Sequence, residues 1–206
     1  LERKPEAVAT LLGVFEDVKS AARSVTELIR SGCVPRCIEL MDEGTLEALR
    51  RQSVAIDPAA RALLLVEVDG PETLVEHDTE RAGNAMAPLA RDVLAAQDAA
   101  QRARLWEGRR ALSPATKKLA KYKLSEDVVV PRTRIVALLE EVERSCEPLG
   151  VRHLTYGHAG DGNLHVNFLW DDAEERPRVD RAIHDLMVAT VRRSEEHTSE
   201  LQSPYV

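Results

Sequence analysis

The sequence predicts a layered fold of the α+β or α/β class with one or two sheets, and three observations support this class. Short apolar runs typical of strands alternate with longer segments whose apolar residues recur at helical spacing. Hydrophobic residues make up 44% of the 206 residues, which is enough to bury a core. No repeat, long linker or low-complexity tract interrupts residues 1–192, so we expect one domain over this range.

In the first half of the chain, turn-forming residues separate three predicted strands from three predicted helices. We expect strands at 11–15, 37–41 and 62–68 and helices at 18–30, 45–51 and 71–87. Gly32 ends the first helix, since glycine readily adopts the left-handed conformation that closes a helix. Asp69 and Gly70 form a turn after the third strand, and Pro71 suits the first turn of the next helix.

In the second half the same alternation continues, and proline marks two boundaries. We expect strands at 93–96 and 127–130, helices at 99–111, 134–146 and from 177 onward, and a glycine-rich loop with one strand within 155–170. The β-branched run at 127–130 is typical of a strand and ends at Pro131. The last helix begins at Pro177 and carries one apolar stripe that packs against a core. This stripe consists of Val179, Ile183, Leu186, Met187 and Val191.

Composition and charge exclude several classes of function. The chain has 35 acidic and 28 basic residues, and its net charge of −7 repels nucleic acid and anionic membranes. Aromatic residues, at 3%, are too few to stack on several bases. No apolar run approaches the ~20 residues of a membrane-spanning helix. The odd number of cysteines does not suit a disulfide framework and favours a reducing compartment.

The two ends of the chain carry signals of their own. The chain starts at Leu1, and its first residues lack the apolar stretch of a signal peptide. The polar segment 193–206 has no periodicity and resembles an in-frame translation of a sequencing-library adapter. We therefore expect residues 193–206 to be an artefact, with a natural polar tail as the alternative.

The segment 157–168 carries most of the chemical information in the sequence. Its three glycines permit a tight turn and allow a ligand to approach the main chain. In the strand that follows, His165 and Asn167 alternate with apolar residues, so the two polar side chains share the face opposite the core. His158 precedes them across the turn, and two imidazoles placed in this way can converge on one divalent metal. A hydrogen-bonded turn around Asp161 that binds nothing explains the spacing equally well.

The same loop is similar to a family signature. Residues 157–167 read G-H-A-G-D-G-N-L-H-V-N, which resembles the G-H-x-G-D-G-N-L-H-x-N motif of the C-terminal domain of FAD-linked oxidases. Two further stretches of that family match upstream. They are L-W-E-G-R at 105–109 followed by S-P-A at 113–115, and K-L-S-E-D-V-V-V-P-R at 123–132. The resemblance covers about residues 5–192.

Both a fold and a function follow from this resemblance as expectations. We expect an α+β domain with one or more ferredoxin-like antiparallel sheets and with helices packed on one face. The family includes glycolate oxidase flavoprotein subunits, cytochrome-linked D-lactate dehydrogenases and D-2-hydroxyglutarate dehydrogenases. The resemblance thus implies the substrate-side domain of an enzyme that oxidises glycolate, D-lactate or D-2-hydroxyglutarate by hydride transfer to FAD.

Individual residues also acquire roles from the resemblance. His158 and His165 match a pair that binds a divalent metal, usually zinc, and we expect both to be catalytic. Residues expected to hold the substrate are Arg109, Ser113, Lys123 and Asn167. Residues expected to contact the cofactor are Gly160, Asp161, Gly162 and Asn163. An arginine suits a substrate carboxylate because its planar guanidinium can bind both carboxylate oxygens.

Two departures from the family pattern limit what the chain is expected to do alone. The family binds FAD mostly through an N-terminal domain, for which 206 residues leave no room. The family also has a later G-E-H-G-x-G motif, whose glutamate is a third metal ligand and whose histidine is a base. Glu196 and His197 imitate that pair but lack the flanking glycines. We therefore expect a domain truncated at its C-terminal end and inactive by itself.

Partners and location are expected only in outline. The electron acceptor is a cytochrome, a quinone or an electron-transfer flavoprotein, and a homodimer or a complex with other oxidase subunits is compatible with the sequence. We expect a cytoplasmic location, or a peripheral one at the inner face of an energy-transducing membrane. The alternative to an enzyme domain is a non-catalytic ferredoxin-like module that binds metal or a protein partner.

Overall fold

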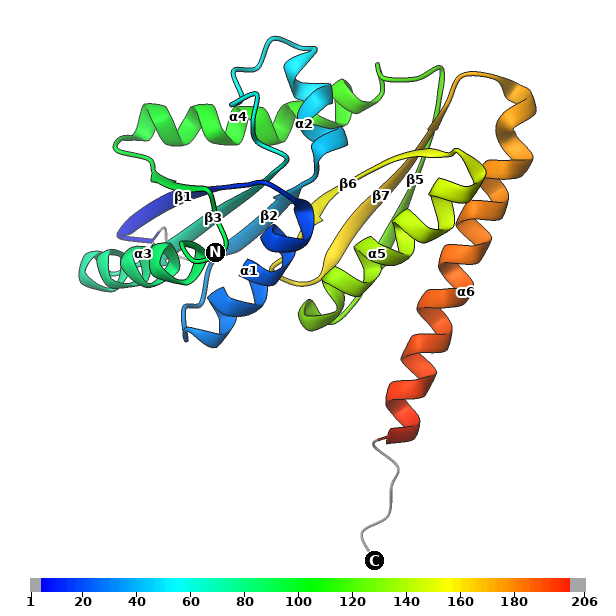
Figure 1. The fold of residues 1–206 in the computed structure, drawn as a ribbon. Helices are drawn as coiled ribbons and strands as arrows, with labels where there is room; N and C mark the ends of the chain where they lie inside the picture. The colour runs from blue at the N-terminus through cyan, green and yellow to red at the C-terminus, as the bar shows by residue number, and fades with distance from the viewer. Residues whose placement is uncertain (1–4, 201–206) are drawn as a thin grey trace, which may run out of the picture.

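The computed structural model of the protein describes residues 5–200, with side chains described as far as Val191. Within these residues, seven strands form one sheet in the order β4-β1-β3-β2-β6-β7-β5. Every neighbouring pair in this sheet is antiparallel. Figure 1 shows the sheet crossing the molecule, with β1–β3 on one side and β5–β7 on the other.

The N-terminal half of the sheet has a ferredoxin-like order. Its elements are β1 (Ala7–Phe15), α1 (Val18–Arg30), β2 (Cys37–Met41), α2 (Glu43–Arg50), β3 (Ala62–Gly70), α3 (Glu72–Met86) and β4 (Asp92–Ala95). Strands β4, β1, β3 and β2 lie side by side in that order, with α1 and α3 as the crossover helices. Helix α2 is an addition between β2 and β3. The expected ferredoxin-like antiparallel sheet is therefore present.

The C-terminal half adds three strands next to β2. Its elements are α4 (Ala99–Thr116), β5 (Tyr122–Val129), α5 (Ile135–Cys146), β6 (Arg152–His158), β7 (Asn163–Trp170) and α6 (Arg176–Glu200). Short 3-10 turns flank α5 and precede α6, at Arg132–Arg134, Glu147–Leu149 and Ala173–Glu175. Strand β2 pairs with β6, so the two halves share one continuous sheet.

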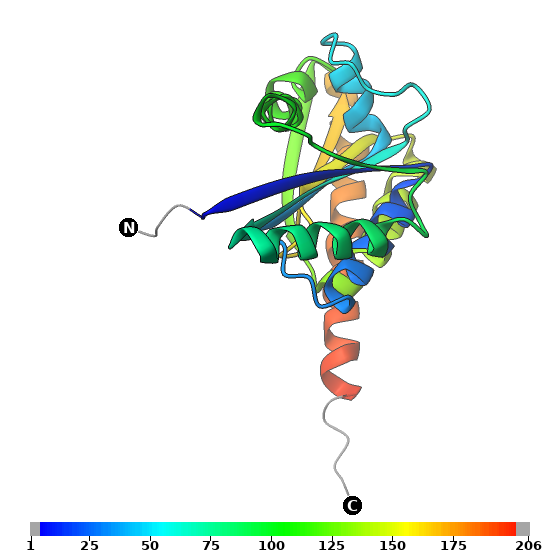
Figure 2. The same cartoon turned by 90° about the vertical axis from the view of Figure 1, so that its left-hand side faces the viewer.

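Helices cover both faces of this sheet. Helices α1, α3, α5 and α6 lie on one face, and α2 and α4 lie on the other (Figures 1 and 2). The α+β class is confirmed, but the helices are not confined to one face as expected. The physical reason is visible in β3, where Leu64 and Val66 point into one core and Leu63 and Leu65 point into the other. A strand that is apolar on both sides needs cover on both sides.

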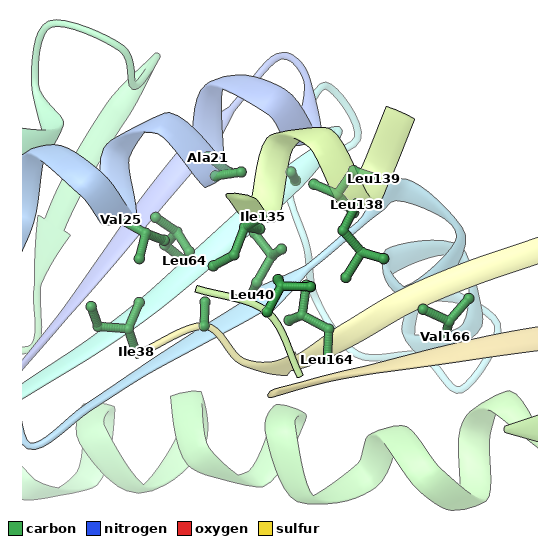
Figure 3. Close-up of a cluster of buried hydrophobic side chains, with 14 of the residues drawn as sticks. Ala21, Val25, Ile38, Leu40, Leu64, Ile135, Leu138, Leu139, Leu164 and Val166 are labelled. Carbon is green, nitrogen blue, oxygen red and sulfur yellow. The ribbon is translucent and has the colours of Figure 1, made fainter. Parts of the chain in front are cut away.

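The larger core lies between the sheet and helices α1 and α5 (Figure 3). Val25 of α1 and Leu138 of α5 face Ile38 of β2 and Leu164 of β7, and these four side chains are at most 4% exposed. Full burial of a side chain of this kind stabilises the fold by about 1.5–3 kcal/mol. This core therefore holds β2 and β7 in place, and both strands carry residues of the candidate site on their other face.

Aspartates begin three of the helices. Asp17, Asp42 and Asp98 each accept a hydrogen bond from the backbone N–H three residues later, at 2.7, 2.9 and 2.7 Å. Each bond satisfies an N–H that has no partner within its helix. Asp42 also accepts a hydrogen bond from the backbone N–H of Thr155 in β6, so its carboxylate joins α2 to the sheet.

Several element boundaries differ from those that the sequence predicts, and β1, for example, begins at Ala7 instead of 11. The region 155–170 holds the end of β6 and the whole of β7, where the sequence predicts one strand. Helix α4 continues to Thr116 with Pro114 in its last turn, whereas the predicted helix ends at 111. Strand β5 begins at Tyr122, whereas the predicted strand begins at 127. The sequence did not predict the first half of this strand because those residues are only partly buried and show no strand pattern.

The last helix, α6, extends to Glu200 and so includes the first part of the segment 193–206. The adapter-derived origin of that segment stays a prediction. Residues 201–206 lie outside the described residues. Among the helices that the structure describes, none combines the length and the apolar composition needed to cross a membrane.

Candidate functional site

A row of polar side chains crosses four neighbouring strands on the face that α4 covers. The register places Glu39 of β2 opposite His158 of β6. Tyr156 of β6 and Asp127 of β5 both stand opposite His165 of β7. Residues opposite one another on antiparallel strands have Cβ atoms about 4.5–5.5 Å apart, so neighbouring members of this row can interact directly.

A tight turn between β6 and β7 places the two histidines on neighbouring strands in the middle of this row. Gly162 in the turn has φ +80°, and a Cβ at this position would lie 1.8 Å from the carbonyl oxygen of Val130. Gly157 has φ +152°, and a Cβ there would lie 2.7 Å from the carbonyl oxygen of Asn163. Any side chain at either position would overlap the backbone, so the turn requires glycine.

The two imidazoles approach each other edge to face, with ring centroids 6.0 Å apart. Nδ1 of His158 lies 2.6 Å from Oε1 of Glu39, and Nδ1 of His165 lies 2.5 Å from Oδ1 of Asp127. Carboxylates therefore occupy Nδ1 of both rings, and Nε2 is the nitrogen left for another partner. The side chain of His158 is 49% exposed and that of His165 is 24% exposed, so solutes can reach both rings.

Helix α4 supplies a cationic side chain, Arg109, that contacts Glu39, the partner of His158. Nε of Arg109 donates a hydrogen bond of 2.7 Å to Oε2 of Glu39. The guanidinium also lies over the ring of Tyr156, with its central carbon 5.4 Å from the ring centroid. Two contacts from different strands thus hold Arg109, whose side chain is only 15% exposed.

A second cation, Lys123, extends from β5 into the same region. Its Nζ donates a hydrogen bond of 2.7 Å to Oγ1 of Thr116 and lies 5.9 Å from the ring centroid of Tyr156. Burial lowers the pKa of Lys123 below its usual value, and the positive charge of Lys117 lowers it further. Both effects penalise the ammonium ion, and the negative charge of a bound anion would offset them.

These side chains line a cavity of about 880 Å³ between α4 and the sheet. Its charged or titratable lining residues are Glu39, Arg109, Arg110, Lys117, Lys121, Lys123, Tyr156, His158 and His165. In the part of the chain that the structure describes, Glu39 is the only carboxylate in this lining. The cavity is therefore positively charged in a chain whose net charge is −7, and a small anion is the ligand that it suits.

Five of the ten expected site residues line this cavity, and the other five do not. Arg109, Ser113, Lys123, His158 and His165 all lie in its wall. Asn167 is fully buried beneath it. Its amide nitrogen donates a hydrogen bond of 2.9 Å to the carbonyl oxygen of His165, and its Oδ1 has no partner among the described residues. A substrate contact of Asn167 remains a proposal.

The turn residues 160–163 are not part of the cavity lining. The N–H of Gly160 donates to the carbonyl oxygen of Ile38, and the carbonyl oxygen of Gly162 accepts from the N–H of Val130. The chain's own backbone thus fills the space that these glycines leave free, so packing within the chain already explains why glycine stands at these positions. Asp161 accepts a hydrogen bond from the N–H of Asn163. Contacts of this turn with FAD remain a proposal.

The donor set around the histidines fits part of a metal site. A ligating histidine commonly donates its other ring N–H to a carboxylate, as the contacts of His158 with Glu39 and of His165 with Asp127 allow. The described residues contain no group of three or more potential metal ligands, however. The chain therefore offers two imidazoles to a metal, and the expected zinc is not supported beyond that.

Sequence reasoning missed three residues of this site: Glu39, Tyr156 and Asp127. One signal could have revealed Glu39, because it is a charged residue inside an otherwise apolar strand run at 37–41. Such a residue is 3% exposed here and needs a buried partner. Tyr156 and Asp127 carry no comparable signal, since only strand pairing reveals that they lie beside His165.

Comparisons with known proteins agree with this architecture. The family described as FAD linked oxidases, C-terminal domain, matches residues 4–194. Glycolate oxidase subunit GlcD of Bacillus subtilis is 30% identical over 98% of this chain and 45% of its own length. The Escherichia coli K12 protein of the same name is 35% identical over 83% of this chain and 35% of its own length. The chain thus spans less than half the length of these curated relatives.

Solved structures share the fold at low sequence identity. P-cresol methylhydroxylase with substrate bound superposes with a TM-score of 0.68 at 12% identity, over 90% of this chain and 44% of the other. Alkyldihydroxyacetonephosphate synthase superposes with a TM-score of 0.65 at 13% identity, over 96% of this chain and 43% of the other. At such identities the likeness concerns the fold alone. Together with the family match over residues 4–194, it leads to one conclusion: the chain belongs to the C-terminal domain family of the FAD-linked oxidases.

Proposed function

We propose that this chain forms the substrate-binding side of an FAD-dependent oxidoreductase that oxidises a small D-2-hydroxy acid. One observation carries the proposal: Arg109 and the two imidazoles of His158 and His165 line the same positively charged cavity. A 2-hydroxy acid presents a carboxylate and, on the adjacent carbon, a hydroxyl group. The cavity offers a cation for the first group and proton-accepting nitrogens for the second.

Arg109 binds the carboxylate in this proposal. Its Nε is used by Glu39, and the two terminal nitrogens of the guanidinium remain for a bidentate contact with the substrate. Lys123 adds a second positive charge from β5, and its lowered pKa indicates an ammonium ion that gains from a neighbouring anion. Ser113, one helical turn beyond Arg109, offers a hydroxyl to the same ligand.

His158 and His165 act on the hydroxyl group. Because carboxylates occupy both Nδ1 atoms, each Nε2 is free to hold a metal or to accept the hydroxyl proton. When bound, FAD supplies the hydride acceptor and a divalent metal such as zinc supplies a Lewis acid. We propose that residues 160–163 approach the flavin from the turn and that Asn167 supports the substrate from beneath His165.

Names of relatives point to the same substrate class. Besides the two glycolate oxidase subunits, a probable mitochondrial D-lactate dehydrogenase of Danio rerio is 27% identical over 85% of this chain. We propose that the electron acceptor is a cytochrome, a quinone or an electron-transfer flavoprotein. We also propose that residues 1–192 need the flavin-binding part of such an enzyme for turnover and are inactive by themselves.

The test is a substrate panel on the gene product that contains this chain. Glycolate, D-lactate and D-2-hydroxyglutarate are each supplied with an artificial acceptor dye, and reduction of the dye is measured. Arg109→Leu is expected to raise KM about 10–100-fold, because a hydrogen bond to a charged group contributes about 1.5–3 kcal/mol. Arg104→Leu is the matched control, since Arg104 is an exposed arginine of α4 outside the cavity lining.

Oxidation of none of these acids by a flavin-loaded protein would refute the proposal. Equal effects of Arg109→Leu and Arg104→Leu would refute the role of Arg109. Replacing His158 and His165 together by alanine, followed by metal analysis, tests the metal contribution separately. Unchanged metal content in the double variant would exclude these imidazoles as ligands.

A further inference from the structure

One buried carboxylate, that of Glu39, contacts both chemical halves of the candidate site. Glu39 is 3% exposed and lies at the middle of β2. Its Oε2 accepts a hydrogen bond of 2.7 Å from Nε of Arg109, and its Oε1 lies 2.6 Å from Nδ1 of His158. The residues it joins come from α4 and β6, 70 positions and 119 positions away in sequence.

The chemistry of the two partners determines what each contact does. A guanidinium only donates hydrogen bonds, so Glu39 is held as an acceptor beside Arg109. A carboxylate that only accepts requires a proton on the imidazole nitrogen facing it, so Nδ1 of His158 carries the N–H. The lone pair of the ring is then on Nε2, on the opposite side of the ring from Glu39.

We infer that Glu39 is a positioning residue that determines the tautomer of His158 and the orientation of the Arg109 guanidinium at the same time. The use of Nε by Glu39 leaves the terminal nitrogens of Arg109 as the donors for an incoming carboxylate. What these aligned groups then bind rests on the proposed function. The tautomer and the orientation themselves follow from the contacts of Glu39 alone.

Asp127 and Glu67, two other carboxylates on neighbouring strands, lack this combination. Asp127 contacts His165 alone, and its side chain is 66% exposed, so water competes for both partners. Glu67 is also buried and lies on the neighbouring strand β3, but it accepts hydrogen bonds from Thr10 and Trp106 and touches neither histidine. Glu67 is therefore a matched control for Glu39, with similar burial and a similar number of donors.

Nitrogen NMR of the chain labelled with ¹⁵N-histidine tests the inference directly. In the unmodified chain the two ring nitrogens of His158 are expected to report a proton on Nδ1 and a bare Nε2. Glu39→Gln puts an amide in place of the carboxylate, and its NH₂ group can donate to Nδ1. The variant is therefore expected to move His158 toward the Nε2–H tautomer, whereas Glu67→Gln is expected to leave the His158 signals unchanged.

Binding of Zn²⁺ alone, measured by titration calorimetry, provides a second readout. Replacing a carboxylate that orients a ligating histidine typically weakens metal binding about 10–100-fold, and we expect this for Glu39→Gln but not for Glu67→Gln. If Zn²⁺ does not bind the unmodified chain, the proposed metal role fails, and the tautomer still decides the role of Glu39. The two failures are thus distinguishable.

Two outcomes would overturn the inference. One is an Nε2–H tautomer of His158 in the unmodified chain, a measurement that needs no variant and so holds even if Glu39→Gln fails to fold. The other is an equal change of the His158 signals in Glu39→Gln and Glu67→Gln, which would indicate a general response to loss of a buried charge. Glu39→Asp, which keeps the carboxylate on a shorter stem, is expected to retain part of the Nδ1–H population.

Discussion

Nε1 of Trp106 donates a hydrogen bond of 2.7 Å to Oε2 of Glu67, and this bond joins the middle of α4 to an interior strand of the sheet. The same oxygen accepts a second hydrogen bond, of 2.9 Å, from Oγ1 of Thr10 in β1. Glu67 is 7% exposed, so water offers little replacement for either donor. This bond therefore ties Trp106, which lines the cavity, to a buried carboxylate outside the lining.

Removal of the indole donor is expected to weaken this connection. Trp106→Phe keeps an aromatic ring but leaves Glu67 with one donor fewer, which costs about 1–3 kcal/mol of unfolding free energy. Thr10→Val removes the other donor to the same oxygen and is the matched variant. The double variant is expected to lose more than the sum of the two, since Oε2 then has neither bond. Urea denaturation measures all three, and strictly additive losses would contradict the shared role.

Asp42 is expected to make stability depend on pH in an unusual direction. Burial raises the pKa of Asp42 to about 6 from 3.8, although hydrogen bonds from Thr45 and Thr155 oppose the shift. Between these two values the folded state binds more protons than the unfolded state, so this residue's contribution to stability falls as pH rises. The fall amounts to about 3 kcal/mol across a shift of this size.

The comparison with Asp42→Asn isolates this contribution, because the variant does not titrate. Unfolding free energies of both proteins are measured in urea at several values from pH 4 to pH 7. The difference between wild type and variant is expected to move against the wild type by up to about 3 kcal/mol over this range. Parallel pH profiles of the two proteins would show that Asp42 has an ordinary pKa.

Alanine substitutions at two glycines, Gly162 and Gly108, are expected to change the stability of the protein in opposite directions. Gly162→Ala places a Cβ 1.8 Å from the Val130 carbonyl oxygen at a residue with φ +80°, which is expected to cost more than about 3 kcal/mol or to prevent folding. Gly108→Ala, inside α4, meets nothing closer than 3.9 Å. It is expected to stabilise the protein by up to about 1 kcal/mol. Thermal or urea unfolding of both variants checks this, and a tolerated Gly162→Ala would contradict the described turn.

Lys123 is expected to favour ligand binding at the expense of stability. Lys123→Met removes an ammonium ion that burial and Lys117 both disfavour, while the Thr116 hydroxyl keeps its bond to the Ser113 carbonyl oxygen. We expect the unfolding free energy to rise by about 0.5–1 kcal/mol and the KM for a 2-hydroxy acid to rise as well. Lys118→Met, at an exposed position beyond the cavity lining, is expected to change stability by less than about 0.5 kcal/mol and to leave KM unchanged. A Lys123→Met protein that is less stable would contradict the argument.

Elements with a strong one-sided or uniformly apolar pattern were predictable from the sequence. Helix α1 and strand β2 have the predicted bounds, Val18–Arg30 and Cys37–Met41. The spacing of their apolar residues along the sequence matches the side chains that are buried in the structure. The sequence did not predict strand β6 as a separate strand, because glycine, threonine and histidine residues interrupt its apolar residues. It forms a strand because β2 and β7 pair with its two edges through backbone hydrogen bonds, and the local sequence pattern does not show this pairing.

The sequence by itself determined the class of fold, the family signature at 157–167, and the side of β7 on which His165 and Asn167 lie. Local periodicity suffices for these, because alternation along one strand assigns each residue to a face. Only the tertiary structure decided that Glu39 lies between Arg109 and His158. That contact requires β2 to pair with β6, two strands far apart in the chain, and requires α4 to cross the same face of the sheet. Which strands become neighbours depends on the packing of the whole core, and for this reason the positioning carboxylate could not be identified from the motif that it supports.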